Sequence, residues 1–274
     1  MALKLIEPLK VGGVVSKEKP TVINLTDYRI RHTDPIPPNV YVAKINGRNK
    51  FSRKNISAWI GKAKSKKTFA MTMLGTAMSA GIDLYETFYS YNPNKVLWID
   101  TEQSPVDAQK IVFRLQKLNG NIDNFFLYGL RPLSPKERIE MIQDALKLHK
   151  PDVLVIDGIR DLVWNINDPV ESTTIVTMVM KWSFDFDMHI AVVIHQTNDG
   201  KARGHIGTEI ENKSETVIKI ERNEHNQEIS NIQENFGRGK GFTDFDFYID
   251  EKGLPVVANV EFKQITADED DIPF

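Results

Sequence analysis

The sequence predicts an α/β fold in which helices flank a mainly parallel sheet and antiparallel strands extend that sheet towards the C-terminus. Three stretches are continuously apolar, namely residues 96–99, 153–156 and 190–194. Strands buried on both faces of a parallel sheet have this composition. After residue 208 the pattern changes to short alternating runs separated by turns, which is typical of antiparallel strands.

The predicted elements alternate along the chain, as parallel sheets with crossover helices require. Strands are predicted at residues 54–60, 95–100, 124–128, 152–157 and 189–195. Helices are predicted at residues 68–80, 105–118, 135–149 and 169–186. Proline at or near the start of three of these helices suits its fixed φ in the first turn. The antiparallel strands are predicted at residues 216–221, 228–234, 244–249 and 256–262, with turns at 223–226, 236–241 and 251–253.

Three regions are predicted from composition. Prolines and glycines punctuate residues 1–40, which we interpret as an N-terminal arm. Residues 41–262 form the α/β domain, and residues 263–274 form an acidic flexible tail. A chain of 274 residues, 41% of them hydrophobic, is long enough to bury a full core in one such domain.

The charge is small overall but unevenly distributed. The formal net charge is −2, yet every charged residue between 48 and 67 is basic and those at 268–271 are all acidic. This asymmetry favours a surface that handles polyanions, separate from an acidic tail. The absence of cysteine excludes disulfides, thiolate metal sites and a cysteine nucleophile. No apolar run approaches the length of a membrane span, so we expect a soluble, cytoplasmic protein.

One motif resembles a phosphate-binding P-loop, G-x-x-x-x-G-K-[ST], with a single departure. Its residues are Gly61, Lys62, Ala63, Lys64, Ser65, Lys66, Lys67 and Thr68. Lys66 stands where the second glycine is usual, and the motif lies between a predicted strand and a predicted helix, where loop N–H groups bind phosphates. We expect Lys67 to reach the β- and γ-phosphates of ATP and Thr68 to hold Mg²⁺. The alternative is a lysine-rich turn that caps a surface helix.

Carboxylates follow two of the apolar strands. Asp157 ends the strand at 152–157, and because ligands bind at the carboxyl ends of parallel strands it is a candidate for holding Mg²⁺ through water. Glu102 follows the strand at 95–100 and is the candidate general base, with Asp100 as the weaker candidate. The alternative for both Asp157 and Glu102 is a role as a cap of the next helix.

Polar residues also follow the last apolar strand. His195 and Gln196 stand at its end and could sense a γ-phosphate by hydrogen bonding. A histidine at this position could equally be a satisfied turn residue.

Together these motifs resemble the RecA-like ATPases, in particular the RepA- and DnaB-type ring helicases and their plasmid and phage relatives. The resemblance covers about residues 50–262 and is carried by residues 61–68, 99–102, 153–157, 195–196 and 203–208, the last of which is similar to the loop that follows the sensor strand. It implies a RecA-like P-loop core, ATP and Mg²⁺ as ligands, single-stranded DNA as partner and a homo-oligomeric ring. By resemblance Glu102 is the catalytic glutamate, Asp157 the Mg²⁺ aspartate and Gln196 the switch to DNA-binding loops.

Such rings commonly place a cation from one subunit in the nucleotide site of its neighbour, where it stabilises transition-state charge. The turn at residues 236–241 carries Arg238 and Lys240 between glycines, and either one is our candidate for this role. Arg203 is a competing candidate. The alternative is a solvated turn without a catalytic function.

The last residues resemble the C-terminal tail of bacterial single-stranded-DNA-binding proteins. Acidic residues precede an Ile-Pro-Phe end, and the segment we expect to bind is Asp270, Asp271, Ile272, Pro273 and Phe274. An aromatic anchor beside a rigid proline suits an apolar pocket with a basic rim. We therefore expect host enzymes that bind such tails as partners, the alternative being an ordinary acidic tail.

Three functions remain open from the sequence. The leading one is an ATP-dependent ATPase that acts on single-stranded DNA in replication, mobilisation or recombination, in the manner of a helicase or translocase. The second is an ATP-dependent accessory of recombination or strand annealing. The third is a weakly hydrolysing nucleotide-binding adaptor that recruits replication enzymes through its tail.

Overall fold

A computed structural model describes residues 24–258 of the chain, apart from residues 198 and 201. The chain divides into two compact units between Pro38 and Asn39. Within the described part of the first unit, residues Leu25–Tyr28 form a short 3-10 helix, η1, whose start is capped by the side chain of Asn24. The predicted tail at residues 263–274 lies outside the described residues.

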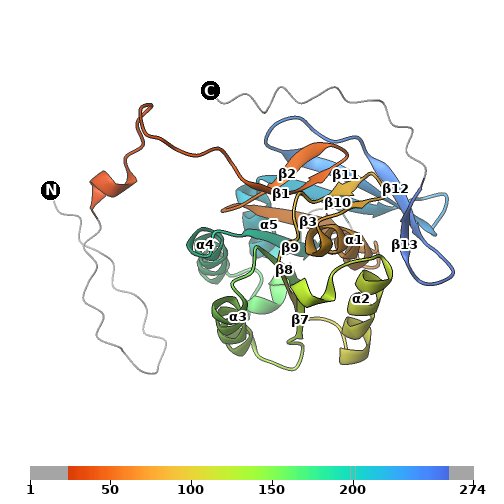
Figure 1. Cartoon of the computed structure of the whole chain (residues 1–274). Helices are drawn as coiled ribbons and strands as arrows, with labels where there is room; N and C mark the ends of the chain where they lie inside the picture. The colour runs from red at the N-terminus through yellow and green to blue at the C-terminus, as the bar shows by residue number, and fades with distance from the viewer. Residues whose placement is uncertain (1–23, 198, 201, 259–274) are drawn as a thin grey trace. The chain divides into compact units, whose positions relative to one another are not determined.

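The second unit is built on a nine-stranded sheet with the order β13-β12-β11-β10-β3-β9-β8-β6-β7 (Figure 1). The strands from β10 to β7 in this order are parallel, and β11, β12 and β13 are antiparallel. Their bounds are β3 (Ile56–Gly61), β6 (Val96–Asp100), β7 (Phe125–Gly129), β8 (Val153–Asp157), β9 (His189–His195), β10 (Thr216–Arg222), β11 (Ile229–Gly237), β12 (Phe245–Ile249) and β13 (Pro255–Val257). The predicted sheet, with its antiparallel C-terminal extension, is confirmed.

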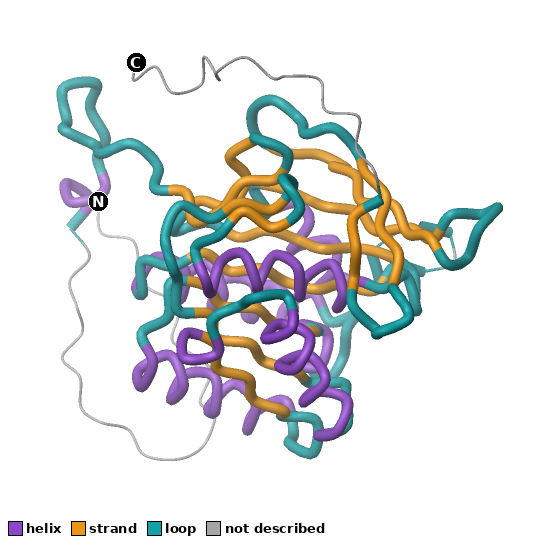
Figure 2. Tube along the Cα trace, turned by 45° about the vertical axis from the view of Figure 1, so that its right-hand side comes forward, coloured by secondary structure: helices purple, strands orange, loops and turns teal. Residues whose placement is uncertain are grey.

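Helices cover both faces of the parallel strands (Figures 1 and 2). They are α1 (Lys67–Ala80), α2 (Pro105–Lys117), α3 (Pro135–His149), α4 (Pro169–Asp185) and α5 (Gly204–Lys213), with 3-10 turns η2 (Ile122–Asn124) and η3 (Ile159–Leu162). Trp98 of β6 points to the core shared with α1 and α2, whereas its neighbour Ile99 points to the core shared with α3, α4 and α5. This alternation explains why the central strands are apolar throughout.

Three helices begin with the prolines that the sequence analysis identified. Proline occupies the first turn of α2, α3 and α4, and the preceding residue caps each helix by accepting a backbone N–H. The caps are Ser104, Ser134 and Asp168. Among the described helices, none is long and apolar enough to cross a membrane.

Two parts of the fold differ from the prediction. A second sheet, with the order β2-β1-β5-β4, comprises β1 (Tyr41–Ile45), β2 (Arg48–Ser52), β4 (Asp83–Leu84) and β5 (Phe88–Tyr89), none of which was predicted. The pair Asn46-Gly47 between β1 and β2 has φ values of 44° and 75°, as a two-residue hairpin turn requires. In addition, the residues predicted as a loop at 203–208 begin helix α5, because Ile206 and Ile210 lie one turn apart and both are buried.

The parallel strands all end at one edge of the large sheet, which we call the carboxyl edge, and begin at the other, which we call the amino edge. The phosphate-loop motif connects the end of β3 to the start of α1 at the carboxyl edge. Because β11 runs antiparallel to β10, with Gly237 paired to Thr216, the chain returns to the amino edge at the end of β11.

Candidate active site

The phosphate-loop motif folds as a tight turn with two residues in the left-handed conformation, Lys64 with φ 64° and Lys66 with φ 69°. Glycine is usual at the position of Lys66 because this conformation carries a steric cost for residues with a Cβ, about 1–2 kcal/mol. Lys66 thus adopts the left-handed conformation that makes glycine the usual residue at this position. Gly61 cannot be replaced by a larger residue without a clash, since an added Cβ would lie 2.3 Å from the carbonyl oxygen of Ile220.

Lys67, in the first turn of α1, is directed into the loop and is only 5% exposed. Its Nζ donates to the carbonyl oxygens of Gly61 at 2.9 Å and Lys62 at 3.0 Å, and it lies 3.3 Å from Nδ1 of His195. Burial lowers the pKa of Lys67 to about 8, against the opposing attraction of the nearby carboxylates. The ammonium therefore lies among the groups that would surround a phosphate.

His195 connects Lys67 to Glu102. Nε2 of His195 lies 3.0 and 3.1 Å from the two carboxylate oxygens of Glu102, while Nδ1 faces the Lys67 ammonium. An ammonium can only donate and a carboxylate can only accept, so these contacts suit a neutral imidazole with its proton on Nε2. The hydrogen bond from His195 lowers the pKa of Glu102 and so favours the carboxylate.

Two further carboxylates lie at the same edge. Thr68 Oγ1 donates to Oδ2 of Asp157 at 3.0 Å. Asp100 is fully buried and accepts the backbone N–H groups of Glu102 and Gln103 at 3.0 and 2.8 Å. Burial, followed by the proximity of Asp100 and Glu102, raises the pKa of Asp157 to about 7. Burial also raises the pKa of Asp100, so both carboxyl groups ionise less readily than free ones, and a nearby cation would favour their charged forms.

This donor set fits Mg²⁺. A hydroxyl next to a carboxylate supplies the oxygen ligands that Mg²⁺ prefers, and Thr68 and Asp157 provide them. Within the part of the chain that the structure describes, the buried atoms at this edge without a hydrogen-bond partner include Oγ of Ser65, Oδ2 of Asp100, Nε of Arg160 and Oε1 of Gln196. No cluster of three metal-binding side chains is found in that part, so phosphate oxygens and water would have to complete the coordination.

Gln196 contacts the segment that precedes α5. Its Nε2 donates to the carbonyl oxygen of Gly200 at 2.7 Å, and its backbone forms an isolated bridge with Ala202. Gln196 thus links the tip of β9 to the segment before α5, whereas His195 makes the contacts with Lys67 and Glu102. Because Gly61 and His195 are register partners in β3 and β9, both strand tips lie side by side. That pairing could have been inferred only from the strand order, which the sequence does not specify.

A cavity of about 500 Å³ lies on the outer side of the phosphate loop. Lys66 Nζ donates to the carbonyl oxygen of Glu228 in the turn between β10 and β11, and so ties this turn to the loop. Burial, with a smaller contribution from Arg222, lowers the pKa of Lys66. The cavity is lined by Lys62, Ala63, Lys64, Ser65, Ile220, Glu221, Arg222, Glu224 and Gln227.

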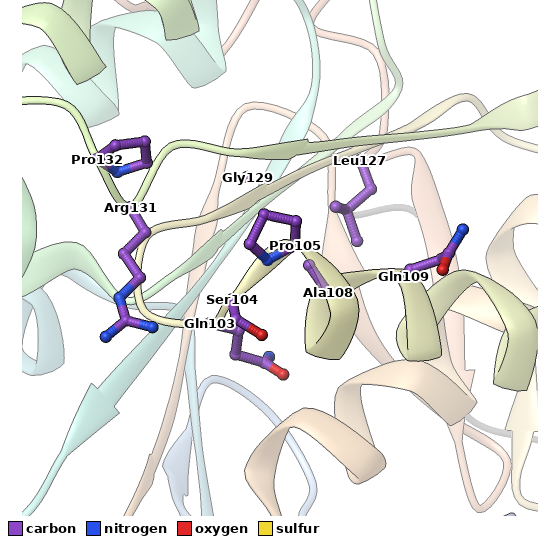
Figure 3. Close-up of a pocket in the computed structure, with 9 residues that line it drawn as sticks. All are labelled: Gln103, Ser104, Pro105, Ala108, Gln109, Leu127, Gly129, Arg131 and Pro132. Atoms are coloured by element: carbon purple, nitrogen blue, oxygen red, sulfur yellow. The ribbon is translucent and has the colours of Figure 1, made fainter.

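A second cavity, of about 600 Å³, lies directly after Glu102 in the chain (Figure 3). The first turn of α2 forms one side with Pro105 and Ala108, and the end of β7 forms another with Leu127. Arg131 lies at its border. Two cavities of ligand size thus flank the charged residues of the carboxyl edge.

The remaining predicted residues lie at different edges. Arg203 precedes α5 at the carboxyl edge, where its N–H donates to the carbonyl oxygen of His195 at 3.1 Å. Arg238 and Lys240 follow β11 and therefore lie at the amino edge, on the far side of the sheet from their own phosphate loop. The structure brings Lys67, Thr68, Glu102, Asp157 and His195 together, but it does not bring Arg238 or Lys240 to them.

Comparison with known proteins supports the interpretation of the loop. A family model described as an AAA domain matches residues 35–201, more than half of the chain and the whole set of carboxyl-edge residues from Gly61 to Gln196. A search of curated proteins gave no significant match.

Proposed function

Because this chain belongs to the AAA-domain family of P-loop ATPases, we propose that it hydrolyses ATP with Mg²⁺, as an oligomer that acts on single-stranded DNA. The observation that carries the proposal is the junction of Lys67, His195 and Glu102 beside the Thr68–Asp157 pair. The residues proposed to bind phosphate, to act as the base and to hold the metal thus lie together at one edge of the sheet.

Each of these residues has a proposed role. The Lys67 ammonium is held by two neutral carbonyl oxygens, and phosphate oxygens are stronger acceptors for a cation, so we expect Lys67 to turn towards bound ATP. Glu102 accepts the proton of the attacking water as general base. Thr68 and Asp157 would hold Mg²⁺, which when bound neutralises charge on the transferred phosphoryl group.

His195 gives this arrangement a control point. While Nε2 of His195 donates to Glu102, the carboxylate is held and its pKa is lowered, which weakens it as a base. Movement of Lys67 towards a phosphate would remove the donor to Nδ1 and loosen the imidazole. We propose that ATP binding releases Glu102 from His195 in this way.

The proposed hydrolysis is tested by phosphate release from ATP with and without Mg²⁺. We expect Mg²⁺-dependent turnover that single-stranded DNA stimulates. ATP binding without turnover would favour the adaptor function instead. If turnover is present, a strand-displacement assay distinguishes a helicase from an annealing accessory.

An exposed tryptophan supports the single-stranded DNA part of the proposal. Trp164 is 74% exposed, although its backbone is fixed: its N–H donates to Glu171 at 2.8 Å. The same segment contacts α5, since His205 N–H donates to the carbonyl oxygen of Ile166 at 2.8 Å, and an added Cβ on Gly204 would lie 2.6 Å from that oxygen. An exposed indole on a fixed backbone at the carboxyl edge suits stacking on an unpaired base, which contributes about 1–3 kcal/mol per base.

Tryptophan fluorescence tests this contact directly. The chain has four tryptophans, and Trp59, Trp98 and Trp182 are all buried, at 0%, 0% and 5% exposure. Binding of an oligonucleotide should therefore quench chiefly Trp164. We expect Trp164→Ala to abolish the quenching and to weaken binding about tenfold. Unchanged binding by Trp164→Ala would contradict the assignment.

The positions of Arg238 and Lys240 bear on the oligomer. Since both lie at the amino edge, they could act on ATP only in the site of another copy, as we propose. Mixing Arg238→Ala subunits, which keep their own site, with Lys67→Ala subunits, which keep the basic residues, should restore hydrolysis that neither has alone. Failure to restore it at any ratio would contradict a role in trans and leave Arg203 as the candidate.

The proposal for the tail rests on the sequence alone. We propose that residues 270–274 recruit host enzymes that bind the tails of single-stranded-DNA-binding proteins. Deletion of Phe274 should abolish pull-down of such an enzyme, and a peptide with the authentic tail sequence should compete with the intact chain. Retained pull-down after the deletion would contradict this proposal.

A further inference from the structure

A buried ion pair lies beside the basic turn, the name we use for residues 237–241. Lys50 of β2 is 2% exposed, and its Nζ lies 2.9 Å from Oε2 of Glu234 in β11. The two residues are far apart in the sequence and come together where the second sheet meets the end of β11. Because the basic turn follows β11 directly, this pair lies at its base.

Both members of the pair also hold the backbone of the chain around the turn. Lys50 Nζ donates to the carbonyl oxygen of Lys240 at 2.6 Å, and Glu234 Oε2 accepts the N–H of Phe242 at 3.1 Å. Gly237 is required by the same packing, since an added Cβ would lie 2.0 Å from Oε1 of Glu234. The ion pair therefore binds one residue within the turn and one just after it.

Two further contacts fix the flanks of the basic turn. The N–H of Arg238 donates to the carbonyl oxygen of Glu215 at 2.9 Å, and Asn46 Nδ2 donates to that of Thr243 at 2.7 Å. Phe242 is buried and packs near Phe245, with ring centroids 6.3 Å apart. In contrast, residues 238–241 are exposed. The turn is thus a fixed backbone that presents its cationic side chains to solvent.

Stability alone does not account for a buried ion pair in this position. Apolar replacements of such pairs are often neutral or stabilising, because burying two charges costs about as much as their attraction returns. Apolar residues could neither donate a hydrogen bond to the carbonyl oxygen of Lys240 nor accept one from the N–H of Phe242. A turn held in one conformation also loses less entropy when its cations meet an anion.

We infer that Lys50 and Glu234 are positioning residues, which fix the basic turn so that Arg238 and Lys240 reach the phosphates of ATP bound to a second copy of the chain. This inference rests on the proposed function, because it presupposes that the basic turn acts in trans. It adds that the second sheet, through Lys50 on β2, takes part in building the site of the neighbouring copy.

The test uses the full chain in mixtures of two subunit types. The recipient carries Arg238→Ala, so it keeps its ATP site and lacks one of the two cations of its basic turn. The donor carries Lys67→Ala, so it supplies only its basic turn. Adding Lys50→Met and Glu234→Met together to the donor removes the ion pair without leaving one charge buried. We expect hydrolysis restored by this donor to fall about fivefold or more below that of the unmodified donor.

A second readout separates positioning from general damage. In a chain with intact Lys67, the double change should lower kcat about fivefold while KM and the binding of a fluorescent ATP analogue stay within about twofold. Lys44→Met is the matched control, because Lys44 lies on the adjacent strand β1, over the ring of Tyr91 and away from the turn. If the double variant does not fold, Glu234→Gln provides the same test with the shape of the side chain kept.

The outcomes separate the positioning role of Lys50 and Glu234 from the role of Arg238 in trans. Full restoration by the modified donor would overturn the positioning role and leave the role of Arg238 in trans intact. Full activity of Arg238→Ala alone would overturn both. Loss of restoration with the modified donor, together with normal ATP binding by the double variant and a normal Lys44→Met control, is the result we expect.

Discussion

The two edges of the large sheet treat their buried polar groups in opposite ways. At the carboxyl edge, atoms of Ser65, Asp100 and Gln196 have no hydrogen-bond partner among the described residues, and three carboxylates lie close together. At the amino edge, Lys50 and Glu234 are paired with each other and with backbone groups, and Glu215 and His189 are both hydrogen-bonded. Oδ1 of Asn46, beside the basic turn, also has no hydrogen-bond partner among the described residues. The charged groups of the amino edge nevertheless satisfy one another, whereas those of the carboxyl edge leave atoms that a ligand could bind.

This difference indicates which buried polar groups bind a ligand and which hold segments of the chain in place. Polar groups that are buried without partners carry a free-energy cost, which a bound ligand can remove. Groups that satisfy one another fix the positions of the chain segments that they join. We therefore assign ligand binding to the carboxyl edge and the positioning of a basic turn to the amino edge.

The largest effect is expected for Glu102→Gln. The amide can still accept a hydrogen bond from Nε2 of His195, but it cannot take a proton from water, so kcat should fall about 10²- to 10³-fold while ATP affinity changes little. Steady-state hydrolysis and equilibrium binding of a fluorescent ATP analogue measure the two quantities. Glu140→Gln, an exposed change on α3, serves as control; a similar loss in it, or none in Glu102→Gln, would contradict the assignment of the base.

Asp157→Asn should stabilise the protein without ligands at pH 8. The pKa of Asp157 is raised from 3.8 to about 7, so between about pH 4 and 7 the folded state keeps a proton that the unfolded state has lost. The free energy of unfolding therefore falls as the pH rises through this window. Since the asparagine cannot titrate, we expect a gain on the order of 2 to 4 kcal/mol at pH 8 and almost none at pH 4.

Urea unfolding at the two pH values, without nucleotide or Mg²⁺, measures this difference. The same variant should bind Mg²⁺-ATP more weakly, because the carboxylate that would hold the metal is gone. If Asp157→Asn were destabilised at pH 8, Asp157 would be a structural residue of the carboxyl edge and not a residue kept for binding a ligand.

Glu215→Gln should have a much smaller effect at the amino edge. Burial raises the pKa of Glu215 to about 7 as well, so its replacement by a residue that cannot titrate removes a cost at pH 8. However, the two carboxylate oxygens of Glu215 accept Ser52 N–H at 2.8 Å and Ser52 Oγ–H at 2.6 Å, and a glutamine has only one oxygen to offer. The lost hydrogen bond costs about 1–2 kcal/mol and offsets most of the gain, so we expect the free energy of unfolding at pH 8 to change by less than about 1 kcal/mol. A stabilisation of Glu215→Gln as large as that of Asp157→Asn would remove the contrast between the two edges.

The smallest effect is expected at Lys66. Lys66→Gly removes the strain of the left-handed conformation but also loses the contact with Glu228 and makes the unfolded chain more flexible. We therefore expect the free energy of unfolding to change by no more than about 1 kcal/mol. Lys66→Val, which places a β-branched residue at a φ of 69°, should cost about 1–2 kcal/mol more. Equal stability of the two variants in thermal melts would contradict the conformational account of this position.

Much of this arrangement could be predicted from residue patterns. The continuous apolar strands and the proline-initiated helices specified the order of the elements, and the residues that follow each strand specified Lys67, Thr68, Glu102 and Asp157 as neighbours at one edge. The prediction succeeded because strand ends in a parallel sheet must share an edge.

Other features depended on contacts between distant segments. The hairpin of β1 and β2 had a local signal in Asn46-Gly47, which the sequence interpretation overlooked. The bridge from Lys67 through His195 to Glu102 required knowing that β9 lies beside β3. The Lys50–Glu234 pair joins residues from two sheets, and no periodicity in either segment marks it. Strand order and the pairing of sheets, rather than local propensity, decide these positions.

The central claim is that the carboxyl edge is an ATP-hydrolysing site. Its most direct test is steady-state ATP hydrolysis by the full chain and by Lys67→Ala, each with and without Mg²⁺ and single-stranded DNA, with Lys147→Ala at an exposed position of α3 as control. We predict turnover that requires Mg²⁺, rises with single-stranded DNA, survives Lys147→Ala and falls at least about 10²-fold in Lys67→Ala. Equal turnover by the full chain and Lys67→Ala, or none by the full chain under any of these conditions, would contradict the claim.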